Sequence, residues 1–131
     1  MFKEFSEEED RIGREIVNAA FQVHKELGPG LLESVYHYAL LKELEIRNIV
    51  AKSKVPVPLF YKGFDTGKYF EIDILVCNEI IIEIKAVEIL HPVFDAQIIS
   101  YLKLSKIKLG YLVNFNVPVL KDGFKRFVNN F

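Results

Sequence analysis

Residues 70–87 read FEIDILVCNEIIIEIKAV, a stretch in which carboxylates and one lysine interrupt two β-rich runs. The runs at residues 70–76 and 80–86 flank a short polar turn at residues 77–79, which predicts a β-hairpin. Aspartate and glutamate are poor strand residues, so the acids inside these runs need a physical reason.

A turn of three residues aligns the two runs in three pairs: Val76 with Ile80, Ile74 with Ile82, and Asp73 with Glu83. Because strand side chains alternate, one face then carries Asp73, Glu83 and Lys85, and the other carries Ile72, Ile74, Ile82 and Ile84. Two carboxylates that oppose each other across a ladder repel unless a cation lies between them. A divalent metal ion is the natural candidate.

The sequence upstream of this hairpin predicts two helices joined by a Gly-Pro-Gly break at residues 28–30. Ser6 and Glu9 fit a capping box, and apolar residues then recur at helical spacing up to Leu27. A second helix is expected over residues 31–47. The two helices together form an N-terminal helical hairpin.

The remaining segments predict a mixed sheet. Residues 55–61 alternate as a strand that two prolines mark as an edge strand, and residues 62–68 form a turn-rich connection. After the carboxylate hairpin, a helix at residues 92–104 leads to an apolar strand at residues 109–115, which predicts a right-handed crossover between parallel strands. A turn at residues 121–123 precedes a short amphipathic tail. The fold class is therefore α/β, a mixed sheet with helices packed on it.

The length of 131 residues predicts a single domain, residues 1–131, that can bury its own core. No apolar run approaches the roughly 20 residues that span a bilayer. The first ten residues are acidic and lack the apolar segment of a signal peptide, so we expect a cytoplasmic protein with no membrane partner. The single cysteine, Cys77, excludes an internal disulfide and any zinc site built from several cysteines.

The charge is balanced overall but unevenly placed. A net charge of −1 argues against a protein that coats nucleic acid nonspecifically. From Tyr101 onward, however, six lysines or arginines face the single acid Asp122. A local basic surface of this kind can steer a polyanion, although a solvated helix face and tail explain the charges more simply.

The acids of the hairpin are hard oxygen ligands that suit Mg²⁺ or Mn²⁺. An ion held by Asp73 and Glu83 could lower the pKa of a bound water and stabilise charge on a scissile phosphate. Lys85 could orient the attacking water, help to deprotonate it, or stabilise the developing charge. The competing interpretation is a surface ion-pair ladder in which Glu71 or Glu83 pairs with Lys85.

Two further features bear on this choice. Gln97 and Tyr101 lie four residues apart on one face of the helix that follows the hairpin, where they could hold a phosphate or simply form a hydrogen bond at the edge of the core. Glu33 lies in the first turn of the second helix, where an acid favourably meets the helix dipole. It shares a face with Tyr36 and could supply a third inward acid.

Gly30, Glu33 and Tyr36 have the spacing G-x-x-E-x-x-Y, directly after HKELGP at residues 24–29. Further blocks follow in order: DILV at 73–76, EIKAVE at 83–88, QIISYL at 97–102, LGYLVNF at 109–115 and LKDG at 120–123. In these blocks, over residues 10–128, the chain resembles the GxxExxY family of small prokaryotic proteins, which is grouped with the PD-(D/E)XK nuclease superfamily.

The resemblance implies a restriction-endonuclease-like αβββαβ core with Asp73, Glu83 and Lys85 as the catalytic triplet. It also implies Glu33 as an accessory acid and Gln97 with Tyr101 as a glutamine–tyrosine pair. The implied metal ligands are Asp73, Glu83, the Ile84 carbonyl and Glu33, with Mg²⁺ or Mn²⁺ as the ion. His91 and Phe94 depart from the pattern, in which a threonine and a histidine are common.

The leading hypothesis is a metal-dependent nuclease that acts on DNA, in preference to RNA, and in a narrower version on branched DNA. Such a small domain with little basic surface may also need a homodimer or an accessory protein to grip its substrate. The alternative is a noncatalytic module that keeps the nuclease fold and binds nucleic acid or a partner protein. A third reading is a structural oligomer with an ion-pair hairpin.

Overall fold

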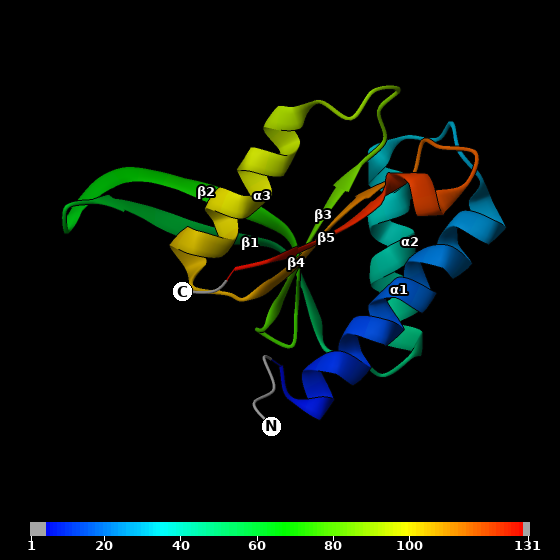
Figure 1. The fold of residues 1–131 in the computed structure, drawn as a ribbon, viewed down its shortest axis with the longest axis horizontal. Helices are drawn as coiled ribbons and strands as arrows, with labels where there is room; N and C mark the ends of the chain where they lie inside the picture. Colours follow the sequence, from blue (N-terminus) through cyan, green and yellow to red (C-terminus); the bar gives the residue numbers. More distant parts are fainter. Residues whose placement is uncertain (1–4, 130–131) are drawn as a thin grey trace.

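The computed structural model of the chain describes residues 5–129; the first four and last two residues of the predicted domain lie outside this range. Within it, three α-helices, five strands and a short 3₁₀ helix follow one another (Figure 1). Their order is α1 (Glu7–Leu27), α2 (Glu33–Ile46), β1 (Ala51–Tyr61), β2 (Phe64–Val76), β3 (Ile80–Lys85), α3 (Pro92–Ser105), β4 (Leu109–Asn114), η1 (Leu120–Gly123) and β5 (Phe124–Val128).

The strands form one sheet in the order β1-β2-β3-β4-β5, in which β3 and β4 are parallel and the other neighbours are antiparallel. Helices α1 and α2 cover one face of the sheet, and α3 covers the other (Figure 1). Each face has its own buried cluster: Ile16, Leu40, Ile82 and Val113 belong to the first, and Ile81, Ile98, Leu102 and Leu112 to the second. The predicted mixed α/β sheet, the parallel crossover and the edge position of β1 are confirmed.

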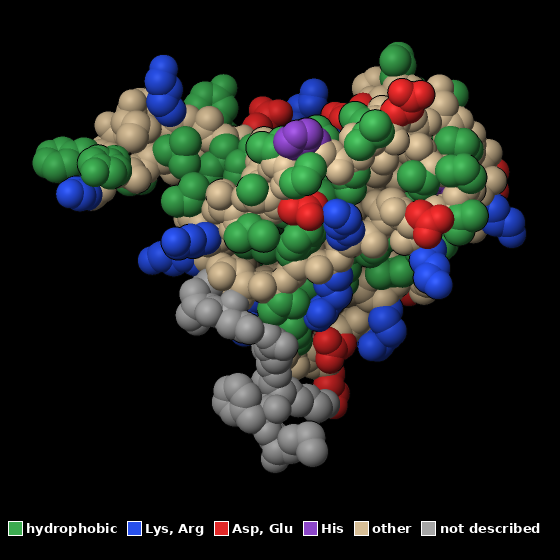
Figure 2. All heavy atoms as spheres, turned by 45° about the horizontal axis from the view of Figure 1, so that its top comes forward, with side chains coloured by type: hydrophobic (Ala, Val, Ile, Leu, Met, Phe, Trp, Pro, Cys, Tyr) green, Lys and Arg blue, Asp and Glu red, His purple; other side chains and the backbone are tan. Residues whose placement is uncertain are grey.

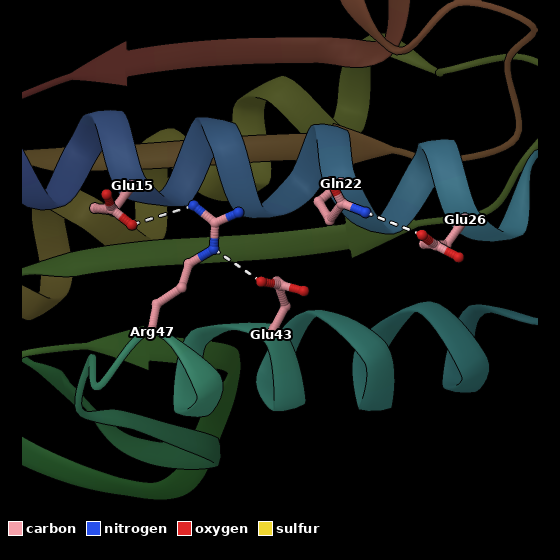
Figure 3. A network of polar contacts seen from close by, with 5 residues as sticks. All are labelled: Glu15, Gln22, Glu26, Glu43 and Arg47. Carbon is pink, nitrogen blue, oxygen red and sulfur yellow. Dashed lines mark hydrogen bonds and ion pairs between the residues drawn. The ribbon is translucent and has the colours of Figure 1, made fainter.

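The helical hairpin is also confirmed, and its ends follow from local chemistry. The Ser6 hydroxyl accepts a hydrogen bond from the Glu9 N–H, while the Glu9 carboxylate accepts one from the Ser6 N–H. After the last residue of α2, Arg47 bridges the two helices, because its guanidinium binds Glu15 of α1 at 3.1 Å and Glu43 of α2 at 2.8 Å (Figure 3).

The carboxylate hairpin has the predicted turn, and its ladder pairs Val76 with Ile80 and Ile74 with Ile82, as expected. The predicted pairing of Asp73 with Glu83 is wrong as a backbone pair, because the ladder stops at Ile74 and Ile82. Beyond that point, side chains replace the main-chain bonds between the two strands.

The prediction that Ile72 shares a face with Ile74 is wrong. Ile72 packs in the cluster beneath α3, whereas Ile74 packs in the cluster beneath α1 and α2. On β1, Lys54 lies between the pairs Ser53–Ile74 and Val55–Ile72 and has a φ of 54°, which is uncommon outside glycine. In both strands the side chains that point to one face of the sheet before this position point to the other face after it. The change occurs at Lys54 in β1 and at Asp73 in β2.

Residues 62–68 are not the turn-rich connection that glycine and lysine suggested. The turn consists only of Lys62 and Gly63, whose φ values of 48° and 82° are those of a tight hairpin turn. Strands β1 and β2 pair on either side of it, from Tyr61 with Phe64 onward. The hairpin beyond Lys54 and Asp73 projects past the rest of the sheet (Figure 1), and we call residues 55–71 the arm.

The predicted amphipathic tail is a strand. After η1, which occupies the predicted turn, β5 pairs antiparallel with β4, from Val113 with Phe124 to Leu109 with Val128. Phe124 and Val128 pack on one buried cluster and Phe127 on the other, so the alternation has the period of a strand.

Of the helices between residues 5 and 129, none combines the length and apolarity that crossing a membrane needs.

Candidate active site

Two crossed hydrogen bonds join the carboxylates of Asp73 on β2 and Glu83 on β3 to the main chain of the opposite strand. A Glu83 carboxylate oxygen, Oε2, accepts a hydrogen bond of 2.9 Å from the Asp73 N–H. In return, Oδ2 of Asp73 accepts one of 2.8 Å from the Ile84 N–H. Each carboxylate thus satisfies a main-chain donor that the interrupted ladder leaves free, and its second oxygen is available for another partner.

This pair is electrostatically unfavourable when both members are ionised. Glu83 is only 4% exposed. Its burial and the neighbouring Asp73 charge raise the pKa of its carboxyl from 4.5 to about 8. Burial also raises the pKa of Asp73, against the opposing effect of the hydrogen bond from Ile84. Two desolvated carboxylates with free oxygens are a donor set that fits a hard divalent cation.

The described residues do not assemble the full predicted ligand set. Between residues 5 and 129, no three His, Cys, Asp or Glu side chains lie close enough together to hold a metal ion. Asp73 and Glu83 are joined by the crossed hydrogen bonds, and Glu33 does not approach both closely enough to complete a group of three. The fit therefore rests on two carboxylates, a number that Mg²⁺ accepts because it usually keeps several of its waters.

Lys85 lies at the end of β3, with its ammonium nitrogen 4.5 Å from the centre of the Phe94 ring on α3. Its charge lowers the pKa of both Asp73 and Glu83, but no ion pair of Lys85 is present in the described part of the chain. Because Glu83 is buried and Lys85 forms no such pair, the surface ion-pair ladder is wrong. Phe94, which departs from the family pattern, positions this lysine.

Glu33 is placed by the loop between the two helices. Tyr36 is fully buried and stacks on Phe115, and its hydroxyl donates to the Gly28 carbonyl at 2.6 Å and accepts from the Leu31 N–H at 3.1 Å. Gly30 has a φ of 95°, a conformation that favours glycine. Because the chain forms this loop, α2 begins at Glu33 and not at the predicted residue 31.

The Glu33 carboxyl lies within electrostatic reach of the acid pair. Its pKa is raised by burial and by the Asp73 charge, and the charges of Lys85 and His37 act in the opposite direction. Glu33 and Asp73 both line a hollow of about 500 Å³ between α2 and the start of the arm. The first turn of α2 thus contributes an acid to the wall beside Asp73.

The same hollow contains residues that the sequence did not single out. Ser53 and Lys54 enter from β1, and His37 enters from α2, where its Nε2 lies 2.7 Å from the Ser53 hydroxyl. This contact gives His37 a polar partner on β1. His37 stands four residues after Glu33, so helical spacing alone could have placed it beside that acid.

Helix α3 carries the predicted glutamine–tyrosine pair on the other face of the sheet. Tyr101 stacks on Phe70 with ring centres 4.1 Å apart, and its pKa is raised by burial and by the charges of Glu83 and Asp73. Hydrogen bonding with the Gln97 side chain acts against this rise. The predicted pair thus interacts and lies within electrostatic reach of the acids. His91 caps the helix, because its Nδ1 accepts from the Val93 N–H at 3.0 Å.

Asn114 holds the segment that leaves β3. Its side chain is buried and forms two bonds with the Val87 backbone: Oδ1 accepts from the N–H at 3.0 Å and Nδ2 donates to the carbonyl at 2.9 Å. The Phe115 N–H also donates to the Lys85 carbonyl at 3.0 Å. These bonds fix the chain just beyond Lys85.

Comparison with known proteins gives one match. No curated protein sequence and no solved structure matches the chain. A family model described as the PD-(D/E)XK nuclease superfamily matches residues 10–127, which include every site residue described above. The three helices and the five-stranded mixed sheet are consistent with a restriction-endonuclease-like fold. The chain therefore belongs to the PD-(D/E)XK nuclease superfamily.

Proposed function

We propose that the protein is a cytoplasmic, single-domain nuclease that hydrolyses phosphodiester bonds of DNA with the help of Mg²⁺ or Mn²⁺. Membership of the superfamily supports a nuclease-type function. The observation that carries the proposal is the hydrogen-bonded pair of Glu83, which is buried, and Asp73, which is half-buried. Each carboxylate has one oxygen outside these bonds, and Lys85 lies two residues after Glu83 on β3.

In this proposal, Asp73, Glu83 and the Ile84 carbonyl hold the ion, and Glu33 is an accessory acid. A bound divalent ion supplies a water of lowered pKa and positive charge at the scissile phosphate. Lys85, kept in place by Phe94, directs its ammonium hydrogens at the attacking water or the phosphate. Gln97 and Tyr101 hold the phosphate from the side of α3.

We further place the chain in the GxxExxY family. The structural roles of the motif support this assignment. Gly30 adopts a left-handed conformation, Tyr36 closes the loop through two hydrogen bonds, and Glu33 begins α2 beside Asp73. Gly30, Glu33 and Tyr36, the three residues that the motif specifies, each have a separate structural role in this chain.

The test is cleavage of labelled DNA and RNA, each as single strands, duplexes and branched junctions, with Mg²⁺ or Mn²⁺. Asp73→Asn and Lys85→Met should each lower the cleavage rate at least about 100-fold, the usual cost of removing a group that stabilises the transition state. Glu79→Gln, which changes an exposed acid in the turn of the same hairpin, should leave the rate unchanged. Equal background from wild type and Asp73→Asn on every substrate would overturn the proposal.

A noncatalytic nucleic-acid-binding or protein-binding module is the second candidate. The incomplete ligand set favours it, because no three His, Cys, Asp or Glu side chains among residues 5–129 lie close enough together to hold a metal ion. Titration calorimetry with Mn²⁺ separates the two functions. A nuclease requires binding that Glu83→Gln removes, whereas the module requires nucleic-acid binding without any metal. Sedimentation at several concentrations tests for the homodimer that a small domain may need.

A further inference from the structure

The arm extends far beyond the rest of the sheet. Only Ile74, Leu75 and Val76 of β2 pair with β3, so the earlier part of β2 pairs with β1 alone. The base of the arm is covered, since Phe70 is buried and Val55, Val57 and Leu59 pack against the cluster beneath α3. Its tip, residues 60–69, is exposed at every position.

The tip gathers aromatic side chains in water. Phe60, Tyr61, Phe64 and Tyr69 are 56–74% exposed. Tyr61 and Phe64 are directly paired across the strands, which places both side chains on the same face of the hairpin. Figure 2 shows hydrophobic side chains at the projecting end with Lys or Arg side chains beside them. Each such ring offers about 150–250 Å² to a partner, and clustered exposed rings mark an interaction site.

The charge of the arm indicates the kind of partner. The arm, residues 55–71, contains two lysines and two acids, and at its tip, residues 60–69, Lys62 and Lys68 outnumber the single acid Asp65. At the tip, Lys62 lies 5.5 Å from the centre of the Tyr61 ring. The single acid of the tip, Asp65, accepts a hydrogen bond from the Gly67 N–H at 2.8 Å within the hairpin. Aromatic rings with adjacent lysines suit a polyanion that also presents flat bases.

Pairing with a second copy through the β1 edge is disfavoured. Strand β1 is the outer strand of the hairpin, but Pro56 and Pro58 have no N–H to donate to another strand. Lys52 and Lys54 add like charges along the same edge, which oppose pairing with an identical strand. The β1 edge is therefore poorly suited to strand pairing, and the tip offers its exposed aromatic side chains to a partner.

We propose that the arm is a nucleic-acid-binding element separate from the acid cluster, in which Tyr61 and Phe64 stack on unpaired bases and Lys62 and Lys68 contact flanking phosphates. This inference rests on the proposed function for the identity of the polymer. The nine residues from Phe64 to Asp73 span about 30 Å as a strand. Unpaired bases would thus be bound roughly nine stacked nucleotides from the scissile phosphate, which selects branched or partly single-stranded substrates.

Fluorescence gives a direct test, because the chain contains no tryptophan. Phe64→Trp places a single tryptophan at the tip, and Phe21→Trp places one on α1, where Phe21 is 42% exposed. With a 20-nucleotide oligothymidine in EDTA, which prevents hydrolysis, Phe64→Trp should be quenched at least twofold and saturably. Phe21→Trp should change by less than about a tenth. Equal responses of the two variants, or no response, would contradict the inference.

Affinity adds a second measurement on the same substrates. Tyr61→Ala/Phe64→Ala should bind oligothymidine at least about tenfold more weakly but bind a fully paired duplex within threefold of wild type. Lys62→Gln/Lys68→Gln should reduce the slope of log affinity against log salt by about 1.4 on the single strand. Equal losses on single strand and duplex would contradict base stacking. A wild-type dimer that the Tyr61→Ala/Phe64→Ala variant converts to a monomer would show a dimer interface instead.

The two proposals fail differently. If wild type cleaves DNA but Phe64→Trp is not quenched, the arm proposal is wrong and the nuclease stands. If Phe64→Trp is quenched but wild type cleaves nothing, the arm proposal stands and the nuclease is wrong. The tryptophan variants should fold like wild type, because Phe64 and Phe21 are exposed and lie outside the core, so both outcomes can be measured on folded protein.

Discussion

Asp73 and Glu83 occupy strand positions that aspartate and glutamate rarely occupy, and the hydrogen bonds explain why they are tolerated. Each carboxylate accepts a main-chain N–H at 2.8–2.9 Å where the β2–β3 ladder has stopped. These bonds stabilise the ionised forms, but burial outweighs them and raises the pKa of each acid, and the Asp73 charge raises the pKa of Glu83 further. The pair is thereby held close together without any side-chain cation bound directly to it.

This arrangement predicts that the metal-free protein loses stability as pH rises from about 4.5 to about 8. Because the pKa of Glu83 is 4.5 when unfolded and about 8 when folded, the folded state binds more protons across this window. The free energy of unfolding, measured with urea in EDTA, should fall by a few kcal/mol, an order-of-magnitude figure. Glu83→Gln should remove most of that slope. Stability that rises through the window would contradict the assignment.

Tyr36 makes a second prediction, about the loop that positions Glu33. Tyr36→Phe removes both hydroxyl bonds, to Gly28 and from Leu31, and should lower the free energy of unfolding by about 1–3 kcal/mol. Tyr38→Phe, at a 67% exposed neighbour, should change it by less than about 0.5 kcal/mol. If Glu33 assists the metal site, Tyr36→Phe and Glu33→Gln should weaken Mn²⁺ binding in the same direction. Equal stability of the two tyrosine variants would show that the loop bonds are unimportant.

Among the secondary-structure elements, periodic patterns and turn chemistry could be predicted, and backbone irregularities could not. The capping box, the Gly28 break and the β3–α3–β4 crossover all follow from residue types at fixed spacings. The face exchange at Lys54 and Asp73 depends on a left-handed lysine, which no spacing signals. Strand β5 was missed because five residues of mixed burial carry too little alternation to distinguish a strand from a tail.

In the site, too, the relations between residues close in sequence could be predicted, and those created by packing could not. Residues close in sequence, such as Glu83 and Lys85, follow from the strand pattern, and helical spacing relates Gln97 to Tyr101. The hollow beside Asp73 was not predictable, because Ser53, Lys54 and His37 meet there only through the packing of α2 against β1. The clamp of Asn114 on Val87 likewise joins residues 27 positions apart.

The short helix η1 gives a prediction about that clamp. A Cβ on Gly123 would collide with the Asn114 main-chain carbonyl, which cannot yield without moving the residue that holds Val87. Gly123→Ala should therefore lower the free energy of unfolding by about 1–3 kcal/mol and reduce cleavage as well. Gly110→Ala is the matched control in β4, because its Cβ would meet only the side-chain ends of Ile98 and Leu102 at 3.1–3.2 Å. A larger effect of Gly110→Ala on cleavage would contradict this role of η1.

The molecule as a whole brings separate layers together at one end of the sheet. Helix α2 contributes Glu33, strands β2 and β3 contribute the crossed acids, and α3 contributes Gln97, Tyr101 and the ring beneath Lys85. The arm extends from the same place, since Lys54 and Asp73 at its base border the hollow. A substrate held by the arm would therefore be directed toward the acids.

The central claim is that Asp73 and Glu83 jointly hold a divalent ion. A crystal of the protein soaked in Mn²⁺ and measured at the manganese absorption edge tests it directly. We predict one anomalous peak between the two carboxylates, with oxygen distances of about 2.0–2.2 Å and the Ile84 carbonyl in the same coordination sphere. No peak at saturating Mn²⁺, with both carboxylates still bonded only to the Asp73 and Ile84 N–H groups, would contradict the claim.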